Sequence, residues 1–91
     1  MAHTIRDKKK LLNRVRRVRG QIEAVERLLE NESECADILQ QIAACRGSIN
    51  ALMAEVLEGH IRCHVAEPEL PDTFRQKAVE ELISITKSYL K

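Results

Sequence analysis

Apolar residues in the first third of the chain recur at alternating spacings of four and three residues. The series comprises Leu11, Val15, Val18, Ile22, Val25 and Leu29. This spacing places all of these side chains along one face of an α-helix. We therefore predict a first helix over residues 5–30, followed by a short break at residues 31–33.

A second apolar series continues through the middle of the chain with the same alternation. It comprises Cys35, Ile38, Ile42, Cys45, Ile49, Leu52 and Val56. The series predicts a helix over residues 34–66, with Ser33 as its N-cap. Such a helix is about 50 Å long, and two shorter helices of the same protomer cannot cover its whole apolar stripe. We therefore expect the chain to form an oligomer.

A third helix is predicted over residues 72–90, after a proline-containing turn and with Asp72 as its N-cap. The chain has one Phe, one Tyr and no Trp, and its three Gly and two Pro leave little turn chemistry for β-hairpins. Its 91 residues fit one domain. We predict an all-α, three-helix protomer over residues 1–91, with residues 1–4 as a flexible tail.

Two features of the composition bear on location. No segment reaches the roughly 18 consecutive apolar residues of a membrane helix, and the N-terminus has no apolar signal core. We expect a cytoplasmic protein without a membrane partner. In that compartment the three cysteines are thiols or metal ligands rather than a disulfide framework.

The charge of the chain is unevenly distributed. Residues 1–20 carry eight basic side chains against one acid, whereas residues 21–91 carry seven basic and thirteen acidic side chains. A basic block on one helix suits an anionic polymer, and its binding should weaken steeply with salt. A solvated charged face is the alternative interpretation. We predict that double-stranded DNA is held through Lys8, Lys9, Lys10, Arg14, Arg16, Arg17 and Arg19.

Histidines four residues apart indicate a metal site at the end of the second helix. His60 and His64 share one helix face. Cys35 lies 25 residues before His60 on the same helix, so about 37 Å separates them along the axis. Two such helices packed antiparallel about a two-fold axis near Ser48 would join Cys35 of one chain to both histidines of the other. Each dimer would then hold two equivalent sites.

Other residues extend the candidate ligand set. Removal of Met1 would leave the Ala2 amine beside His3, and an amine with a neighbouring imidazole can chelate a metal. Cys63 is a less certain ligand, and Cys45 fits the core. One sulfur among several nitrogens suits Ni(II) or Co(II), whereas Zn(II) needs four ligands and Cu(I) favours more sulfur. Cys35 as a small core residue and His3 in a frayed tail are the competing interpretations.

The chain closely resembles the CsoR/RcnR family of metal- and formaldehyde-responsive repressors. The resemblance rests on KKKLLNRVRRVRG at 8–20, QIEA at 21–24, ECADILQQIAACRG at 34–47 and LMAEVLEGH at 52–60. It implies a three-helix protomer that forms an antiparallel dimer and then a flat tetramer. It also implies repression of an efflux or detoxification gene, relieved when an effector lowers the affinity for DNA.

Within that family, the ligand set resembles the nickel- and cobalt-responsive branch. The resemblance lies in His3, Cys35, His60 and His64, and in the opening sequence HTIRDK. Copper sensors of the family carry Cys in place of His64, and formaldehyde sensors usually carry Pro after Met1 and no His at position 64. Cys63 departs from the nickel/cobalt pattern, and the Arg-rich first helix resembles the formaldehyde branch equally well.

These observations predict a homotetrameric repressor, without enzymatic activity, that controls a metal-efflux gene and responds to Ni(II) or Co(II). Two alternatives stand beside it. One is a formaldehyde-responsive repressor in which a methylene bridge joins the Ala2 amine to the Cys35 thiolate. The other is a metal-storage protein or metallochaperone.

Overall fold

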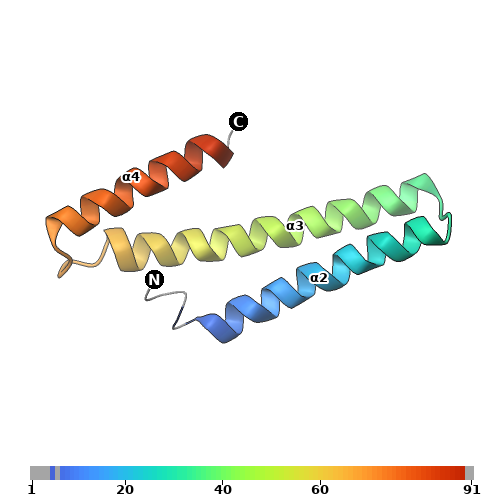
Figure 1. Ribbon diagram of the computed structural model, residues 1–91, viewed down its shortest axis with the longest axis horizontal. Helices are drawn as coiled ribbons and strands as arrows, with labels where there is room; N and C mark the ends of the chain where they lie inside the picture. Colours follow the sequence, from blue (N-terminus) through green and yellow to red (C-terminus); the bar gives the residue numbers. More distant parts are fainter. Residues whose placement is uncertain (1–4, 6, 90–91) are drawn as a thin grey trace.

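The computed structural model describes Ile5 and residues 7–89, and every regular element in that part of the chain is helical. Helix α2 spans Lys8–Glu30, α3 spans Cys35–His60, the short π-helix η1 spans Ile61–Val65, and α4 spans Asp72–Tyr89 (Figure 1). The predicted all-α, three-helix protomer is therefore confirmed. The predicted tail at residues 1–4 lies outside the described residues.

The connection between α2 and α3 is a tight turn stabilised by backbone hydrogen bonds. The Ser33 amide donates to the Leu28 carbonyl over 3.0 Å, and Glu32 has a positive φ of 54°. This left-handed conformation is typical of the residue that ends a helix. Because the amide of Ser33 closes α2, the N-cap of α3 is Glu34 rather than the predicted Ser33.

The second helix is not α-helical as far as residue 66. Its α-helical part ends at His60, and the next turn is the π-helix η1. The Ala66 amide donates to the Ile61 carbonyl five residues earlier, over 2.7 Å. A π-turn is rare and is found frequently at functional sites, because it changes the direction of the side chains around it. Here it contains two predicted ligand positions, Cys63 and His64.

Arg75 stabilises the turn that leads into α4 through hydrogen bonds to backbone carbonyls. Its Nε donates to the Val65 carbonyl over 2.9 Å, and its Nη2 donates to the Glu67 carbonyl over 2.8 Å. The Pro71 carbonyl accepts the amide of Arg75 over 3.0 Å and so begins the α4 hydrogen-bond ladder. Pro71, rather than the predicted Asp72, therefore holds the N-cap position, and Asp72 is the first residue of the helix.

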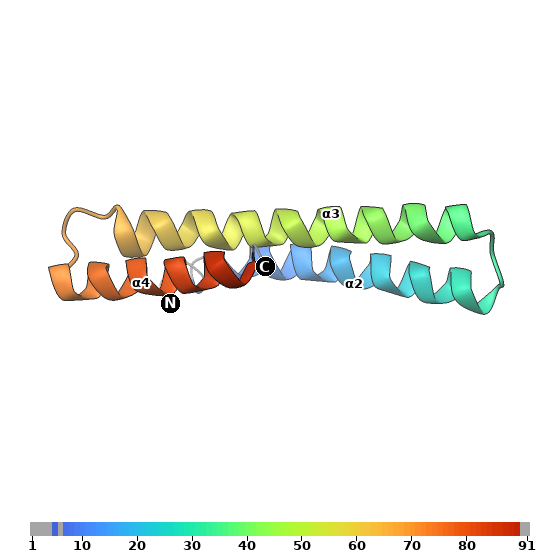
Figure 2. The ribbon, with the colours of Figure 1, turned by 90° about the horizontal axis from the view of Figure 1, so that it is seen from above.

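The protomer is flat, with extents of 55 × 30 × 13 Å. In Figure 1, α2 and α4 lie on opposite sides of α3, and Figure 2 shows each running beside a different half of it. Helix α4 meets the rest of the described chain mainly at η1. None of the described helices is long and apolar enough to cross a membrane.

The interior of the protomer is small. Among the described residues, the buried apolar side chains are Cys45 and Ala78, and α2 buries none of its residues. The predicted stripe of α2 is therefore only half covered. Ile22 remains 52% exposed and lines an open groove of about 270 Å³ with Val25, Ile42, Cys45, Arg46 and Ile49, which we call the apolar groove.

Candidate metal centre and nucleic-acid interface

His60 and His64 come together at the junction of α3 and η1. They are 6% and 7% exposed, and they are the buried polar residues of the described chain. Their Nδ1 atoms lie 3.1 Å apart, and the rings meet edge to face with centroids 4.8 Å apart. The sequence prediction that both imidazoles share one face therefore agrees with their placement.

A backbone carbonyl of α4 orients the His60 ring. The Nε2 of His60 lies 3.1 Å from the Ala78 carbonyl oxygen. A carbonyl can only accept, so Nε2 carries the proton and the lone pair of Nδ1 faces His64. Metal-binding histidines are commonly held in this way through the ring nitrogen that does not bind the metal. The His64 ring is in turn packed edge-on against Phe74, with centroids 5.6 Å apart.

The separation of the two Nδ1 atoms fits a shared metal ion. Nitrogen ligands lie about 2.1 Å from a first-row metal, so neighbouring ligands on one ion are about 2.9–3.4 Å apart. The observed 3.1 Å falls within that range. The pair can therefore supply two imidazole ligands without a large rearrangement.

The remaining predicted ligands are not assembled within one protomer. Cys35 is exposed at the first residue of α3, the opposite end of that helix from His60. Cys63 is half-buried and lines an open hollow of about 500 Å³ with His64 and Phe74. Ala2 and His3 lie outside the described residues. Within the described chain, no three His, Cys, Asp or Glu side chains are grouped closely enough to hold a metal.

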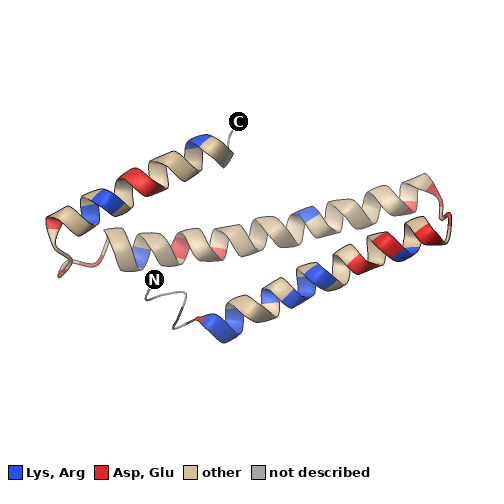
Figure 3. Ribbon diagram, viewed as in Figure 1, with Lys and Arg blue, Asp and Glu red and all other residues tan. Residues whose placement is uncertain are grey.

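The predicted DNA-binding residues all lie in the first half of α2, which we call the basic half of α2 (Figure 3). Six of them are exposed, and the seventh, Arg14, is half-buried against α3. Acidic residues are confined to the second half of the same helix, at Glu23, Glu26 and Glu30. The basic half of α2 can therefore lie along a phosphate backbone.

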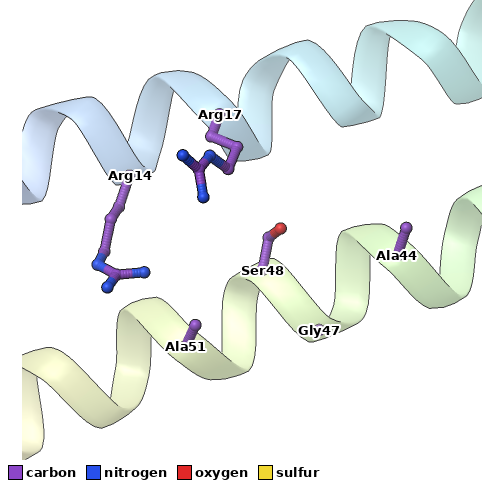
Figure 4. A pocket seen from close by; sticks show the side chains of 6 residues that line it. All are labelled: Arg14, Arg17, Ala44, Gly47, Ser48 and Ala51. Carbon is purple, nitrogen blue, oxygen red and sulfur yellow. The ribbon is translucent and has the colours of Figure 1, made fainter.

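Two arginines of the basic half point across toward small residues of α3. Arg14 and Arg17 border a hollow of about 210 Å³ whose other wall is formed by Ala44, Gly47, Ser48 and Ala51 (Figure 4). A second hollow of about 220 Å³ is lined by Lys10, Asn13, Arg14 and Arg17. Both hollows are open to solvent and bordered by guanidinium groups, an environment suited to an anion.

Sequence reasoning missed Glu55, which lies on α3 opposite the basic half of α2. Its Oε1 is 3.1 Å from Arg14 Nη2, and its Oε2 is 3.3 Å from Lys10 Nζ. The hydrogen bond from Lys10 lowers the pKa of Glu55 below its ordinary value, and the positive charges of Lys10 and Arg14 outweigh the opposing effect of partial burial. The carboxylate is therefore charged and engaged at neutral pH.

Comparison with known proteins shows to which family the chain belongs. Residues 7–88 match the family described as metal-sensitive transcriptional repressors.

The chain belongs to this family.

Relatives support the assignment over the full length. The chain is 42% identical to the transcriptional repressor RcnR of Citrobacter koseri and 54% identical to an uncharacterized Serratia marcescens protein from the bioA 5′ region, covering all of both chains. Its structure is similar to that of a variant of the formaldehyde-responsive regulator FrmR from Salmonella enterica serovar Typhimurium. That match has a TM-score of 0.84 and 45% identity and covers 92% of this chain and 94% of the other.

Membership confirms the predicted CsoR/RcnR resemblance and the role in transcriptional repression. It also confirms the prediction that the protein is not an enzyme, because the family consists of repressors. A family of metal-sensitive repressors that bind DNA as oligomers agrees with a buried histidine pair, a basic helix and an uncovered apolar groove on one protomer. Repression is therefore favoured over metal storage.

Proposed function

We propose that this protein is a homotetrameric repressor of a metal-efflux gene that releases double-stranded operator DNA when it binds Ni(II) or Co(II). The observation that carries the proposal is the histidine pair. Its Nδ1 atoms are 3.1 Å apart, and the Ala78 carbonyl fixes the His60 ring. We expect the protein to act in the cytoplasm, where its DNA is found.

The uncovered apolar surface supports the antiparallel dimer that completes the site. Ile42 and Ile49 of α3 are 46% and 44% exposed and line the apolar groove with Ile22. A second copy packed there with a two-fold axis near Ser48 would cover these side chains. It would also carry its own Cys35 to the His60 and His64 of its partner.

The start of α2 supports a contribution from the N-terminus. Asp7 lines an open hollow with Glu55, Glu58 and Gly59, so α2 begins beside the residue that precedes His60. Asp7 follows His3 by four positions, a length of chain that spans up to about 13 Å. His3 and the Ala2 amine are therefore within reach of the histidine pair.

The proposed ligands are the Ala2 amine, His3, His60, His64 and a partner Cys35, with Cys63 as a further thiol near them. Several nitrogens with one thiolate favour Ni(II) or Co(II) over Zn(II) or Cu(I). Such an ion would supply Lewis acidity that holds amine, imidazole and thiolate in one cluster. Within the chain, the Ala78 carbonyl keeps the proton of His60 on Nε2, so that Nδ1 stays available.

Coupling to DNA follows from the position of the tail. The segment that carries Ala2 and His3 leads directly into the basic half of α2, so fastening it to His60 restrains the helix that holds phosphates. We propose that this restraint tilts the basic half and lowers its affinity for DNA. By linkage, bound DNA then weakens metal binding by the same factor.

The test is DNA-binding anisotropy of the Cys35→Ala variant with and without Ni(II), with Cys63→Ser as the matched control. We expect Cys35→Ala to bind DNA normally and to lose the response to Ni(II), because it removes the thiolate without touching α2. Cys63→Ser should retain the response. If Cys35→Ala still releases DNA on addition of Ni(II), the proposed site is wrong.

A formaldehyde response is the second candidate, favoured by the similarity to FrmR and by the exposure of Cys35 at the first turn of a helix. Helix N-termini favour the thiolate. The Ala2 amine would add to formaldehyde, and the Cys35 thiolate would then displace water to leave an N–CH2–S bridge. Intact-mass analysis of the treated protein would show a gain equal to one carbon atom, absent in Cys35→Ala.

A further inference from the structure

Glu55 holds the two basic side chains that face α3 across the α2–α3 interface. One carboxylate oxygen pairs with Arg14 at 3.1 Å and the other with Lys10 at 3.3 Å. The side chains of Glu55 and Arg14 are 27% and 32% exposed, so solvent and a second anion can reach them. The charges of Lys10 and Arg14 are therefore already paired with a carboxylate of the same chain.

A DNA phosphate would require the same donors. Phosphate and carboxylate both offer pairs of anionic oxygens to the guanidinium fork and to the ammonium group. The two hollows that Arg14 and Arg17 both border show where an incoming phosphate would be held. Arg14 is thus paired with Glu55 and also borders an open hollow that can take an anion. Figure 4 shows this hollow.

We propose that Glu55 competes with DNA phosphates for Arg14 and Lys10 and so sets the DNA affinity of the protein below the value that its basic helix would otherwise give. The inference rests on the proposed DNA-binding function and assigns a specific role within it. Arg17 borders the same hollow as Arg14, and the α3 residues that form its other wall are small and uncharged. Arg17 is therefore the phosphate anchor, while Arg14 and Lys10 exchange one anion for another.

The chain offers a matched control for charge. Glu58 lies one turn further along α3, pairs with Arg62 of η1 at 3.0 Å, and is more exposed than Glu55. Glu55→Gln and Glu58→Gln change the net charge equally. Only Glu55→Gln removes an ion-pair partner of the basic half. The difference in DNA affinity between the two variants therefore measures competition for Lys10 and Arg14, separately from the effect of net charge.

The experiment measures binding of wild type and both variants to a mixed-sequence duplex of about 30 base pairs at salt concentrations from about 50 to 200 mM. We expect Glu55→Gln to bind about 3- to 10-fold more tightly than Glu58→Gln. Lys10→Ala should weaken binding more strongly in the Glu55→Gln background than in wild type. Glu55→Asp, which shortens the side chain and retains the charge, should fall between wild type and Glu55→Gln.

The outcomes separate the two proposals. Wild type that fails to bind the duplex at the lowest salt overturns the DNA-binding function, and competition with it. Wild type that binds, with Glu55→Gln equal to Glu58→Gln, overturns competition alone. Weaker binding by Glu55→Gln also overturns competition, because Glu55 then positions its partners for DNA. If Glu55→Gln is shown by circular dichroism to be unfolded, Glu55→Asp decides the question by the same comparison with wild type.

Discussion

The α2–α3 interface and the junction of α3 with η1 and α4 differ in how they hold functional side chains. Along the α2–α3 half, cationic side chains stand at the surface and are held by charge, through Glu55. At the junction with η1 and α4, two imidazoles are buried and held by short contacts to a backbone carbonyl and an aromatic ring. Surface charge suits an extended polymer, whereas burial and fixed geometry suit a single ion. The two regions therefore suit the two kinds of recognition proposed for them, and variants should separate the two.

The largest expected effect is on metal binding. His64→Ala removes one imidazole of the pair, and we expect the affinity for Ni(II) or Co(II) to fall by at least about 100-fold. Isothermal titration or metal-competition spectroscopy measures the change, and DNA binding without metal should stay within a few-fold of wild type. Phe74→Leu is the control, because it alters the packing around His64 without removing a donor. Equal losses in both variants would contradict the assignment of His64 as a ligand.

The next largest effect is expected on DNA binding, when a charge is removed from the basic half of α2. Arg17→Ala should weaken DNA binding by about 10-fold and reduce the salt slope by about one per contacting copy. Its affinity for metal in the absence of DNA should be unchanged. Arg62→Ala removes the same charge from η1 and should have a much smaller effect on DNA-binding anisotropy. A loss of metal affinity in Arg17→Ala would show that the basic half of α2 and the histidine pair do not act independently.

Arg75 tests whether the histidine end depends on its turn. Arg75→Ala removes hydrogen bonds to the carbonyls of Val65 and Glu67, and we expect the free energy of unfolding to fall by about 1–2 kcal/mol. Arg75→Lys should recover little of the lost free energy, because an ammonium group cannot replace the paired donors of the guanidinium group. Urea unfolding at fixed protein concentration measures both. Arg62→Ala, which breaks an exposed ion pair, should cost no more than about 0.5 kcal/mol.

The smallest effect is expected at the opposite turn, between α2 and α3. Glu32 has a φ of 54°, a conformation that glycine adopts without a steric penalty. Glu32→Gly should therefore raise the free energy of unfolding by up to about 1 kcal/mol. Glu26→Gly, inside α2, should lower it by about the same amount. Thermal unfolding of the pair measures the difference, and a loss of stability in both would contradict this explanation.

The α2–α3 half was largely predictable because its periodicity is regular. The heptad series predicted the first two helices and the short break between them. The position of Glu55 was also available in principle. In an antiparallel hairpin whose break is centred near residues 32 and 33, facing residue numbers add up to about 65. That register pairs Lys10 with Glu55 and Arg17 with Ser48, as the ion pair and the hollow show.

The histidine end was predictable only in part. Spacing alone placed His60 and His64 on one face, but a 3.6-residue period contains no signal for the π-turn that follows His60. The contact with the Ala78 carbonyl depends on the direction of α4, which the Arg75 hydrogen bonds set. Ser33 and Asp72 were wrong as N-caps, because the carbonyls of Glu34 and Pro71 accept the first helical amides of α3 and α4.

A protomer 13 Å thick is a single layer of helices, with two outer faces and almost no inside. Such a layer gains most of its burial when copies meet, so assembly and folding become one equilibrium that depends on abundance. The concentration of this chain in the cell then governs both the number of complete oligomers and the lifetime of each folded molecule. Halving its synthesis would lower the concentration of working repressor by more than half.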